Sequence, residues 1–164
     1  MSWNDQGPDG GDVRFEPGDL DDLDDVMAVM EESFDPAFGE AWTAPQCAGL
    51  LPMPGVWLTV ARDDDRPLGF ALGRAVAREA ELLLLAVRRS DQRRGIGRGL
   101  LERFGDEAAR RGAERLHLEV RDGNHAVKLY TAGGYTEVGR RRNYYSGRDG
   151  QVYDALTLAK PSRR

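Results

Sequence analysis

The sequence predicts an α+β protein in which a mixed β-sheet carries helices on both faces. Three observations support this class. Helical patterns come early, strand patterns follow one another in the middle, and the order strand, helix, strand, helix, strand, strand ends the chain. With 164 residues, the chain is long enough for a sizeable core. We expect a single domain over residues 12–160.

The N-terminal part is expected to begin with a disordered tail, because residues 1–11 are rich in Gly, Asp and Pro. Residues 13–15 follow as an edge strand. Asp19 is a plausible N-cap of a helix, since its side chain can accept from free backbone N–H groups. Apolar residues then repeat at helical spacing: Leu20, Leu23, Val26, Met27 and Met30. Thr43 is expected to cap a shorter helix that reaches Leu51.

The middle of the chain reads as three strands over residues 56–62, 68–76 and 79–87. The third becomes continuously apolar toward its end, as expected of a central strand buried on both faces. A helix then runs from Ile96 and stops at Gly112.

The last third of the chain is expected to alternate strands and a helix. A fourth strand covers residues 115–120, and a short helix covers residues 124–132. A final pair of strands follows at residues 136–142 and 152–159.

Composition excludes several classes of protein. The net charge of −5 argues against a general nucleic-acid binder, whose surface would be strongly basic. Cys47 is the single cysteine, so neither an intrachain disulfide nor a cysteine-ligated zinc site is expected, and we predict no metal. The N-terminus lacks the pattern of a signal peptide, and no apolar run approaches about 20 residues. We therefore expect a cytoplasmic protein that binds no membrane.

The most informative stretch covers residues 86–101, AVRRSDQRRGIGRGLL. It joins an apolar strand to a helix, and it contains Gln92-x-x-Gly95-x-Gly97. A glycine-containing turn with free backbone N–H groups at a helix N-terminus binds phosphate, because the amides and the helix dipole both favour negative charge. Glycines that merely begin a helix beside solvated arginines are the alternative.

Three motifs together resemble the GCN5-related N-acetyltransferase (GNAT) family. They are QRRGIGRGLL, then LEVRDGNHAVKLYTAGGY at residues 118–135, and then RRNYY followed by Asp154-Ala155. The third resembles one subgroup, the bacterial RimI-type ribosomal-protein-alanine N-acetyltransferases. The chain departs from the family pattern at Arg89 and Asp91, where a proline and an aromatic residue are usual, and over residues 35–54, which align poorly.

The resemblance implies a mostly antiparallel sheet with a strand splay that binds acetyl-CoA. The main chain of Ala86 and Val87 would contact pantetheine and the acetyl carbonyl. Asn124 would hydrogen-bond the pantetheine arm, although a simple helix N-cap is its other reading. The pyrophosphate would be held by the loop and the start of its helix: Arg93, Arg94, Gly95, Ile96, Gly97 and Arg98.

The same resemblance implies two catalytic residues. Glu119 interrupts an apolar strand and would take the proton of the acceptor amine, directly or through one water. Tyr130 would contact the cofactor and protonate the departing thiolate, because a phenol of pKa ~10 can donate to a thiolate whose thiol has a pKa of ~8.5. A surface glutamate and a buried aromatic residue are the structural alternatives.

The acceptor is implied to be the N-terminal alanine of a small-subunit ribosomal protein. Trp42, Glu119, Tyr144 and Tyr145 are the candidate residues for binding it, because adjacent tyrosines suit peptide recognition. Two alternatives remain. The acceptor could be a small amine, such as a polyamine, an amino acid or an antibiotic, or the domain could bind acetyl-CoA without catalysis.

Overall fold

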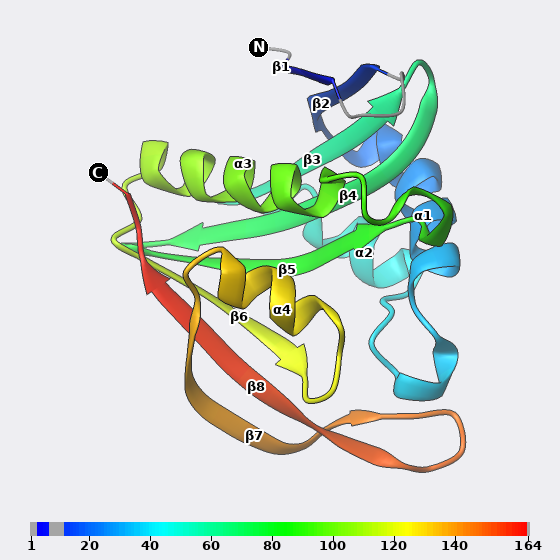
Figure 1. Cartoon of the computed structure of the whole chain (residues 1–164), viewed down its shortest axis with the longest axis vertical. Helices are drawn as coiled ribbons and strands as arrows, with labels where there is room; N and C mark the ends of the chain where they lie inside the picture. The colour runs from blue at the N-terminus through cyan, green and yellow to red at the C-terminus, as the bar shows by residue number, and fades with distance from the viewer. Residues whose placement is uncertain (1–2, 7–11, 164) are drawn as a thin grey trace.

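The computed structural model describes residues 3–6 and 12–163. Over these residues the chain forms one eight-stranded sheet, in the order β1-β2-β3-β4-β5-β6-β8-β7 (Figure 1). Only β5 and β6 pair in parallel, and every other neighbouring pair is antiparallel. The predicted α+β class with a mixed, mostly antiparallel sheet is confirmed.

The N-terminal half contains three strands and two α-helices in addition to short 3₁₀ turns. Its elements are β1 (Trp3–Gln6), β2 (Asp12–Gly18), η1 (Leu20–Asp22), α1 (Leu23–Ser33), η2 (Pro36–Phe38), α2 (Ala44–Leu50) and β3 (Val56–Asp63). Both predicted caps are confirmed: Asp19 and Thr43 each form a capping box with the residue three positions later.

The structure corrects the prediction at the N-terminus. Trp3–Gln6, expected in a disordered tail, form strand β1 and pair with β2. Strand β2 is therefore not the edge of the sheet, because β1 occupies that position. The other residues of the expected tail lie outside the described residues.

The second half supplies the remaining strands and the two helices of the opposite layer. Its elements are β4 (Arg66–Val76), β5 (Glu79–Val87), η3 (Arg89–Asp91), α3 (Ile96–Arg110), β6 (Arg115–Arg121), α4 (Ala126–Ala132), β7 (Thr136–Ser146) and β8 (Val152–Pro161). Strand β7 continues beyond the predicted residue 142, because Tyr145 and Ser146 still pair with Tyr153 and Val152 of β8.

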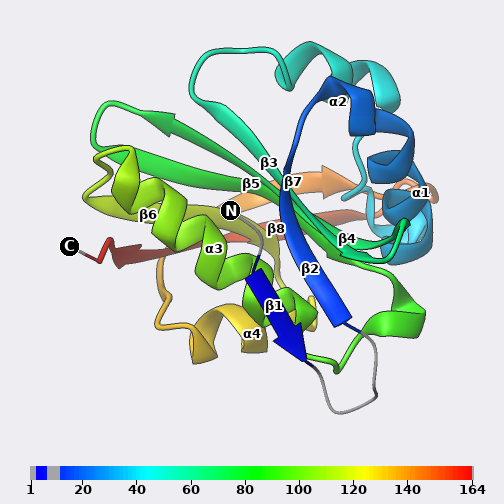
Figure 2. The same cartoon turned by 90° about the horizontal axis from the view of Figure 1, so that it is seen from above.

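Helices α1 and α2 cover one face of the sheet, and α3 and α4 cover the other (Figure 2). Each layer has its own core. Met30 and Cys47 belong to the core beneath α1 and α2, whereas Leu100, Phe104 and Tyr130 belong to the core beneath α3 and α4. Burial of these apolar faces is the main force that holds the layers on the sheet.

Strands β5 and β6 separate partway along their length. They pair only from Glu79 and Arg115 to Leu82 and Leu118. At the same point β5 contains a bulge, because Leu72 and Gly73 of β4 face Leu84 and Leu82 and leave Leu83 unpaired. The side chains change faces there: Leu82 lies in the α3 core and Leu84 in the α1 core. The expected strand splay is thus present.

Strand β7 forms the other edge of the sheet and is mostly exposed. Its pairing with β8 is interrupted twice, between Glu137 and Gly139 and between Arg141 and Tyr145. Asn143, within the second interruption, has a left-handed backbone with φ of 53°. Such irregularities locally bend and twist a strand.

Candidate active site

The predicted phosphate loop joins β5 to α3 and has an open backbone. Arg93 and Gly95 both adopt left-handed conformations, with φ of 66° and 79°. A Cβ atom on Gly95 would meet no heavy atom within 4 Å, so the space beside its backbone is free. A Cβ atom on Gly97 would instead lie 3.2 Å from Leu129 of α4, so this glycine allows α3 and α4 to approach. The loop therefore presents a concave backbone at a helix N-terminus, a geometry that binds anions.

Asp91 anchors this loop. Asp91 carries a charge and is nevertheless buried, with 5% of the residue exposed. Its carboxylate accepts from Arg94 at 2.9 Å and forms an ion pair with Arg66 at 3.0 Å. Burial alone would raise the pKa of Asp91, but hydrogen bonds from Arg66, Ser90 and Arg94 outweigh it and lower the pKa below its usual value.

The three predicted phosphate-binding arginines are placed differently. Arg94 is committed to Asp91, so its guanidinium holds the loop in shape. Arg98 is exposed and pairs with Glu102 one turn along α3, at 3.2 Å. Arg93 is also exposed. Arg93 and Arg98 thus remain accessible to an anion bound at the helix N-terminus.

The main chain of β5 beyond the bulge corrects one prediction. The Arg88 N–H donates to the Leu68 carbonyl of β4 at 2.8 Å. Because main-chain groups of alternate residues point to opposite sides of a strand, those of Ala86 also point toward β4. Those of Leu85 and Val87 point toward the splay, where β5 has no paired neighbour. The predicted contact from Ala86 is therefore replaced by Leu85, because the register that decides this is not visible in the sequence.

Glu119 is the first residue of β6 beyond the last pair with β5. Its neighbours Leu118 and Val120 lie in the α3 core, so Glu119 points to the opposite face, toward α1 and α2. The carboxylate accepts from the Thr157 hydroxyl at 2.8 Å and pairs with Arg141 at 3.2 Å. These two contacts orient a carboxylate whose side chain is 11% exposed.

Tyr130 lies on α4, on the other face of the sheet from Glu119. It is buried, and its ring meets that of Tyr135 edge-on with centroids 6.2 Å apart. Burial raises the pKa of the Tyr130 hydroxyl well above its usual value, with smaller contributions from Tyr135 and the negative charge of Glu40. The phenol is therefore protonated at neutral pH.

Asn124 lies one residue before His125, the N-cap of α4. Its side-chain oxygen accepts from the Ala126 N–H at 2.8 Å, and its amide donates to Glu40 at 3.1 Å. Glu40 also forms an ion pair with Arg121. The sequence did not identify Glu40, and no local signal marks it, because its partners lie more than 80 positions away in the chain.

The predicted acceptor residues are only partly brought together. Tyr145 lies close to the site: burial, followed by the charge of Glu40, Tyr144, Glu119 and Tyr130, raises the pKa of its hydroxyl above the usual value. Tyr144 is exposed and packs edge-on against Tyr145, with centroids 4.9 Å apart. Trp42 is half-buried and packs against the core beneath α1 and α2.

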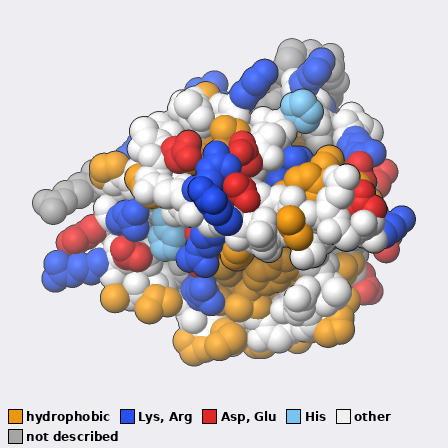
Figure 3. All heavy atoms as spheres, turned by 90° about the horizontal axis from the view of Figure 1, so that it is seen from below, with side chains coloured by type: hydrophobic (Ala, Val, Ile, Leu, Met, Phe, Trp, Pro, Cys, Tyr) orange, Lys and Arg blue, Asp and Glu red, His pale blue; other side chains and the backbone are white. Residues whose placement is uncertain are grey.

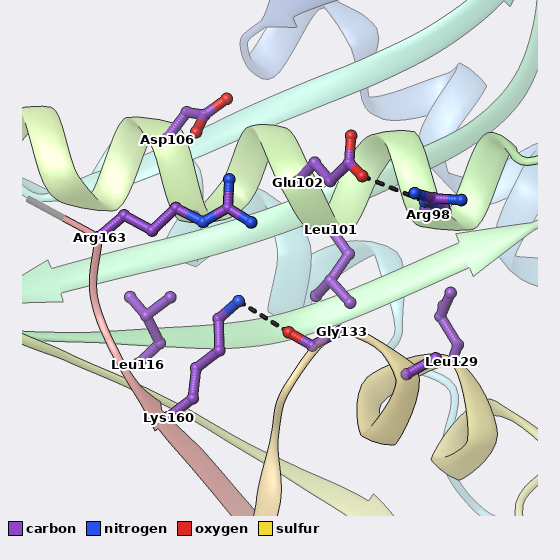
Figure 4. A pocket seen from close by; sticks show the side chains of 11 residues that line it. Arg98, Leu101, Glu102, Asp106, Leu116, Leu129, Gly133, Lys160 and Arg163 are labelled. Atoms are coloured by element: carbon purple, nitrogen blue, oxygen red, sulfur yellow. Dashed lines mark hydrogen bonds and ion pairs between the residues drawn. The ribbon is translucent and has the colours of Figure 1, made fainter.

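The surface seen from below has a hollow floored by hydrophobic side chains, beside a group of basic and acidic side chains (Figure 3). A different pocket, of about 350 Å³, lies between α3, α4 and the end of β8 (Figure 4). Its lining includes Glu102, Asp106 and Lys160, and Lys160 donates to the Gly133 carbonyl at 2.8 Å. Neither Glu119 nor Tyr130 lines this second pocket.

Within residues 3–6 and 12–163, no helix combines the length and apolar character needed to cross a bilayer.

The chain is similar to known proteins in both sequence and fold. The pattern of the Acetyltransferase (GNAT) family matches residues 23–135. The [ribosomal protein bS18]-alanine N-acetyltransferase of Salmonella typhimurium is 46% identical over 99 residues, which are 60% of this chain and 66% of that protein. The match thus spans slightly less than two thirds of the length of this curated relative.

Solved structures share the fold over nearly the whole chain. The ribosomal-protein-S18-alanine N-acetyltransferase from Escherichia coli has a TM-score of 0.82 and 31% identity, covering 93% of this chain and 95% of that one. Arabidopsis thaliana NAA60 in complex with acetyl-CoA has a TM-score of 0.78, with coverage of 91% and 98%. Its 16% identity shows likeness of fold alone. Given the family match and the first of these structures, the chain belongs to the Acetyltransferase (GNAT) family.

Proposed function

We propose that this chain is an N-acetyltransferase that moves the acetyl group of acetyl-CoA to the N-terminal alanine of ribosomal protein bS18. The observation that carries the proposal is the position of Glu119 at the fork between β5 and β6, with Tyr130 buried on the opposite face of the sheet. The names of the Salmonella and Escherichia coli relatives support the acceptor. Such an enzyme would act in the cytoplasm.

Acetyl-CoA would bind as a co-substrate at the splay. Its pyrophosphate would lie against the open backbone between Arg93 and Arg98, and its pantetheine arm would pair with the main-chain groups of Leu85 and with the Val87 N–H, as a strand would. The remaining N–H of the Asn124 amide would donate to the same arm. Binding of acetyl-CoA by the structurally similar NAA60 is consistent with this arrangement.

The transfer requires a neutral amine and a proton for the leaving thiolate. Glu119 would take one proton of the alanine ammonium group and pass it to solvent, after which the amine nitrogen attacks the thioester carbonyl. As the carbon–sulfur bond breaks, the nitrogen releases its second proton to Glu119. Tyr130 would donate its proton to the thiolate. Burial raises the pKa of the Tyr130 phenol, so the phenol keeps its proton until the thiolate forms.

A panel of acceptors tests this function. We expect the chain to acetylate a peptide with an N-terminal alanine in preference to polyamines and amino acids. Glu119→Gln and Tyr130→Phe should each lower kcat about 100-fold, since one proton transfer contributes roughly that much, while the KM for acetyl-CoA changes little.

Glu137→Gln is the control, because Glu137 is an exposed carboxylate on β7 outside the site. Activity confined to small amines would contradict the proposed acceptor. Wild-type kcat in both variants would contradict the catalytic roles. Binding of acetyl-CoA without turnover on any acceptor would indicate a non-catalytic domain.

A further inference from the structure

The segment from Pro36 to Glu40 packs backbone to backbone against the end of β7. A Cβ atom on Gly39 would lie 2.0 Å from the carbonyl oxygen of Ser146, and one on Gly147 would lie 2.0 Å from the carbonyl oxygen of Ala37. Gly39 also has φ of 69°. We call residues 36–42 the acceptor loop, because they border Tyr145. Only glycine permits this close approach, so the acceptor loop is fixed against the strand that carries Tyr145.

The acceptor loop places Glu40 against Arg121 at the end of β6. Both side chains are close to fully buried, at 9% and 11% exposure. The guanidinium of Arg121 also lies over the ring of Phe38, 3.8 Å from its centroid. Phe38 therefore encloses the Glu40–Arg121 ion pair on the side of the acceptor loop. Removing either partner of a buried ion pair is strongly destabilising, because the other charge is left uncompensated.

The second carboxylate oxygen of Glu40 points toward Asn124, a proposed cofactor-binding residue. It accepts from the Asn124 amide nitrogen, and the oxygen of the same amide accepts from the Ala126 N–H in the first turn of α4. Tyr130 lies one turn further along the same helix. A continuous chain of polar contacts thus joins the acceptor loop, through Glu40 and Asn124, to the helix that carries Tyr130.

We infer that Glu40 is a positioning residue that couples acceptor binding to cofactor binding. Its carboxylate holds the Asn124 amide and Arg121 in one arrangement. When the cofactor orders the start of α4, the acceptor loop is therefore ordered as well. Binding of the acceptor likewise orders the start of α4. The inference rests on the proposed function, since it assigns the two ligands to the two ends of this chain of contacts. Reciprocity is required, because the coupling free energy between two binding sites is shared.

The test is the affinity of an alanine-start peptide with and without coenzyme A, measured by isothermal titration calorimetry. In the wild type, coenzyme A should tighten peptide binding at least about fivefold. Glu40→Gln should reduce this factor below about twofold, because a neutral amide keeps one acceptor but loses the ion pair. Glu31→Gln is the matched control, since it removes an exposed carboxylate of α1 and should keep the wild-type factor.

A compensating pair separates positioning from structural damage. When Glu40→Gln is combined with Asn124→Asp, the new amide at position 40 can donate to the new carboxylate at position 124. The other oxygen of that carboxylate can still accept from Ala126, so part of the coupling should return. If Glu40→Gln does not fold, Asn124→Ser carries the same test, because serine keeps the cap but does not reach Glu40. Wild-type coupling in the variants, or none in the wild type, would overturn the inference. Absence of acetyl transfer to any amine would instead refute the proposed function.

Discussion

The phosphate loop, residues 88–98, and the acceptor loop, residues 36–42, are held in opposite ways. The phosphate loop is held in part by near neighbours, since Asp91 pairs with Arg94 and the Gln92 amide donates to the Val87 carbonyl at 3.2 Å. It is held in part by β4, through the ion pair of Asp91 with Arg66. The acceptor loop is held by residues more than 80 positions away, through Glu40 and Gly39. The phosphate loop thus depends on contacts of shorter sequence separation than the acceptor loop, whose Glu40 and Gly39 contacts require the last third of the chain.

Asp91→Asn should have the largest effect and should disturb the phosphate loop alone. Removing one partner of a buried ion pair typically costs about 3 kcal/mol, and here Arg66 and Arg94 both lose their counter-charge. We expect this loss of unfolding free energy in urea at pH 7, with a higher KM for acetyl-CoA. The KM for the acceptor, measured at saturating acetyl-CoA, should stay unchanged, and an equal rise under that condition would show that the phosphate loop also shapes the acceptor loop.

The destabilisation caused by Asp91→Asn should depend on pH. Because the folded pKa of Asp91 is lowered, its stabilisation is complete above the unfolded pKa of about 3.9 and is lost as the pH falls through the folded pKa. The difference in unfolding free energy between wild type and Asp91→Asn should therefore shrink below about pH 4.

Gly39→Ala should have the next largest effect, with Gly95→Ala as its matched partner. Both residues have left-handed backbones, which cost alanine about 1 kcal/mol. Only the Gly39 variant also forces a backbone atom away, so its loss should reach about 2 kcal/mol or more. Urea unfolding measures both losses. The KM for the acceptor should rise in Gly39→Ala and that for acetyl-CoA in Gly95→Ala; the reverse assignment would contradict the division between the loops.

Arg98→Gln should have the smallest effect. Its side chain is 79% exposed and its pair with Glu102 is solvated, so unfolding free energy should change by less than about 0.5 kcal/mol. The KM for acetyl-CoA should rise about threefold at low salt, and the difference should fade at high salt as screening increases. A salt-independent change in KM would show that Arg98 acts through packing.

Much of the fold could be predicted from local pattern. The Asp19 and Thr43 caps and the apolar run of β5 depend on residues close in sequence. The far end of β7 could not be predicted, because pairing of Tyr145 with Tyr153 depends on a hairpin register that an exposed, arginine-rich strand does not reveal.

Some residues of the candidate site could likewise be predicted from local sequence, and others could not. The glycines of the phosphate loop follow from a short motif, and Glu119 and Tyr130 remain predictions that rest on the family resemblance. The proposed contact shifts from Ala86 to Leu85, because the side to which the main chain of Ala86 points depends on pairing with β4. Asp91 and Glu40 could not be assigned, since a buried carboxylate is recognised only by the arginines that the fold brings to it.

The irregular edge strand β7 also has a consequence for solubility. A long, regular edge offers unpaired N–H and C=O groups to another chain and invites fibrous association. The two breaks in β7, its left-handed Asn143 and its run of arginines at residues 140–142 make that edge a poor template for a further strand. The segment that borders the candidate acceptor site thereby also keeps one copy of the sheet from extending into the next.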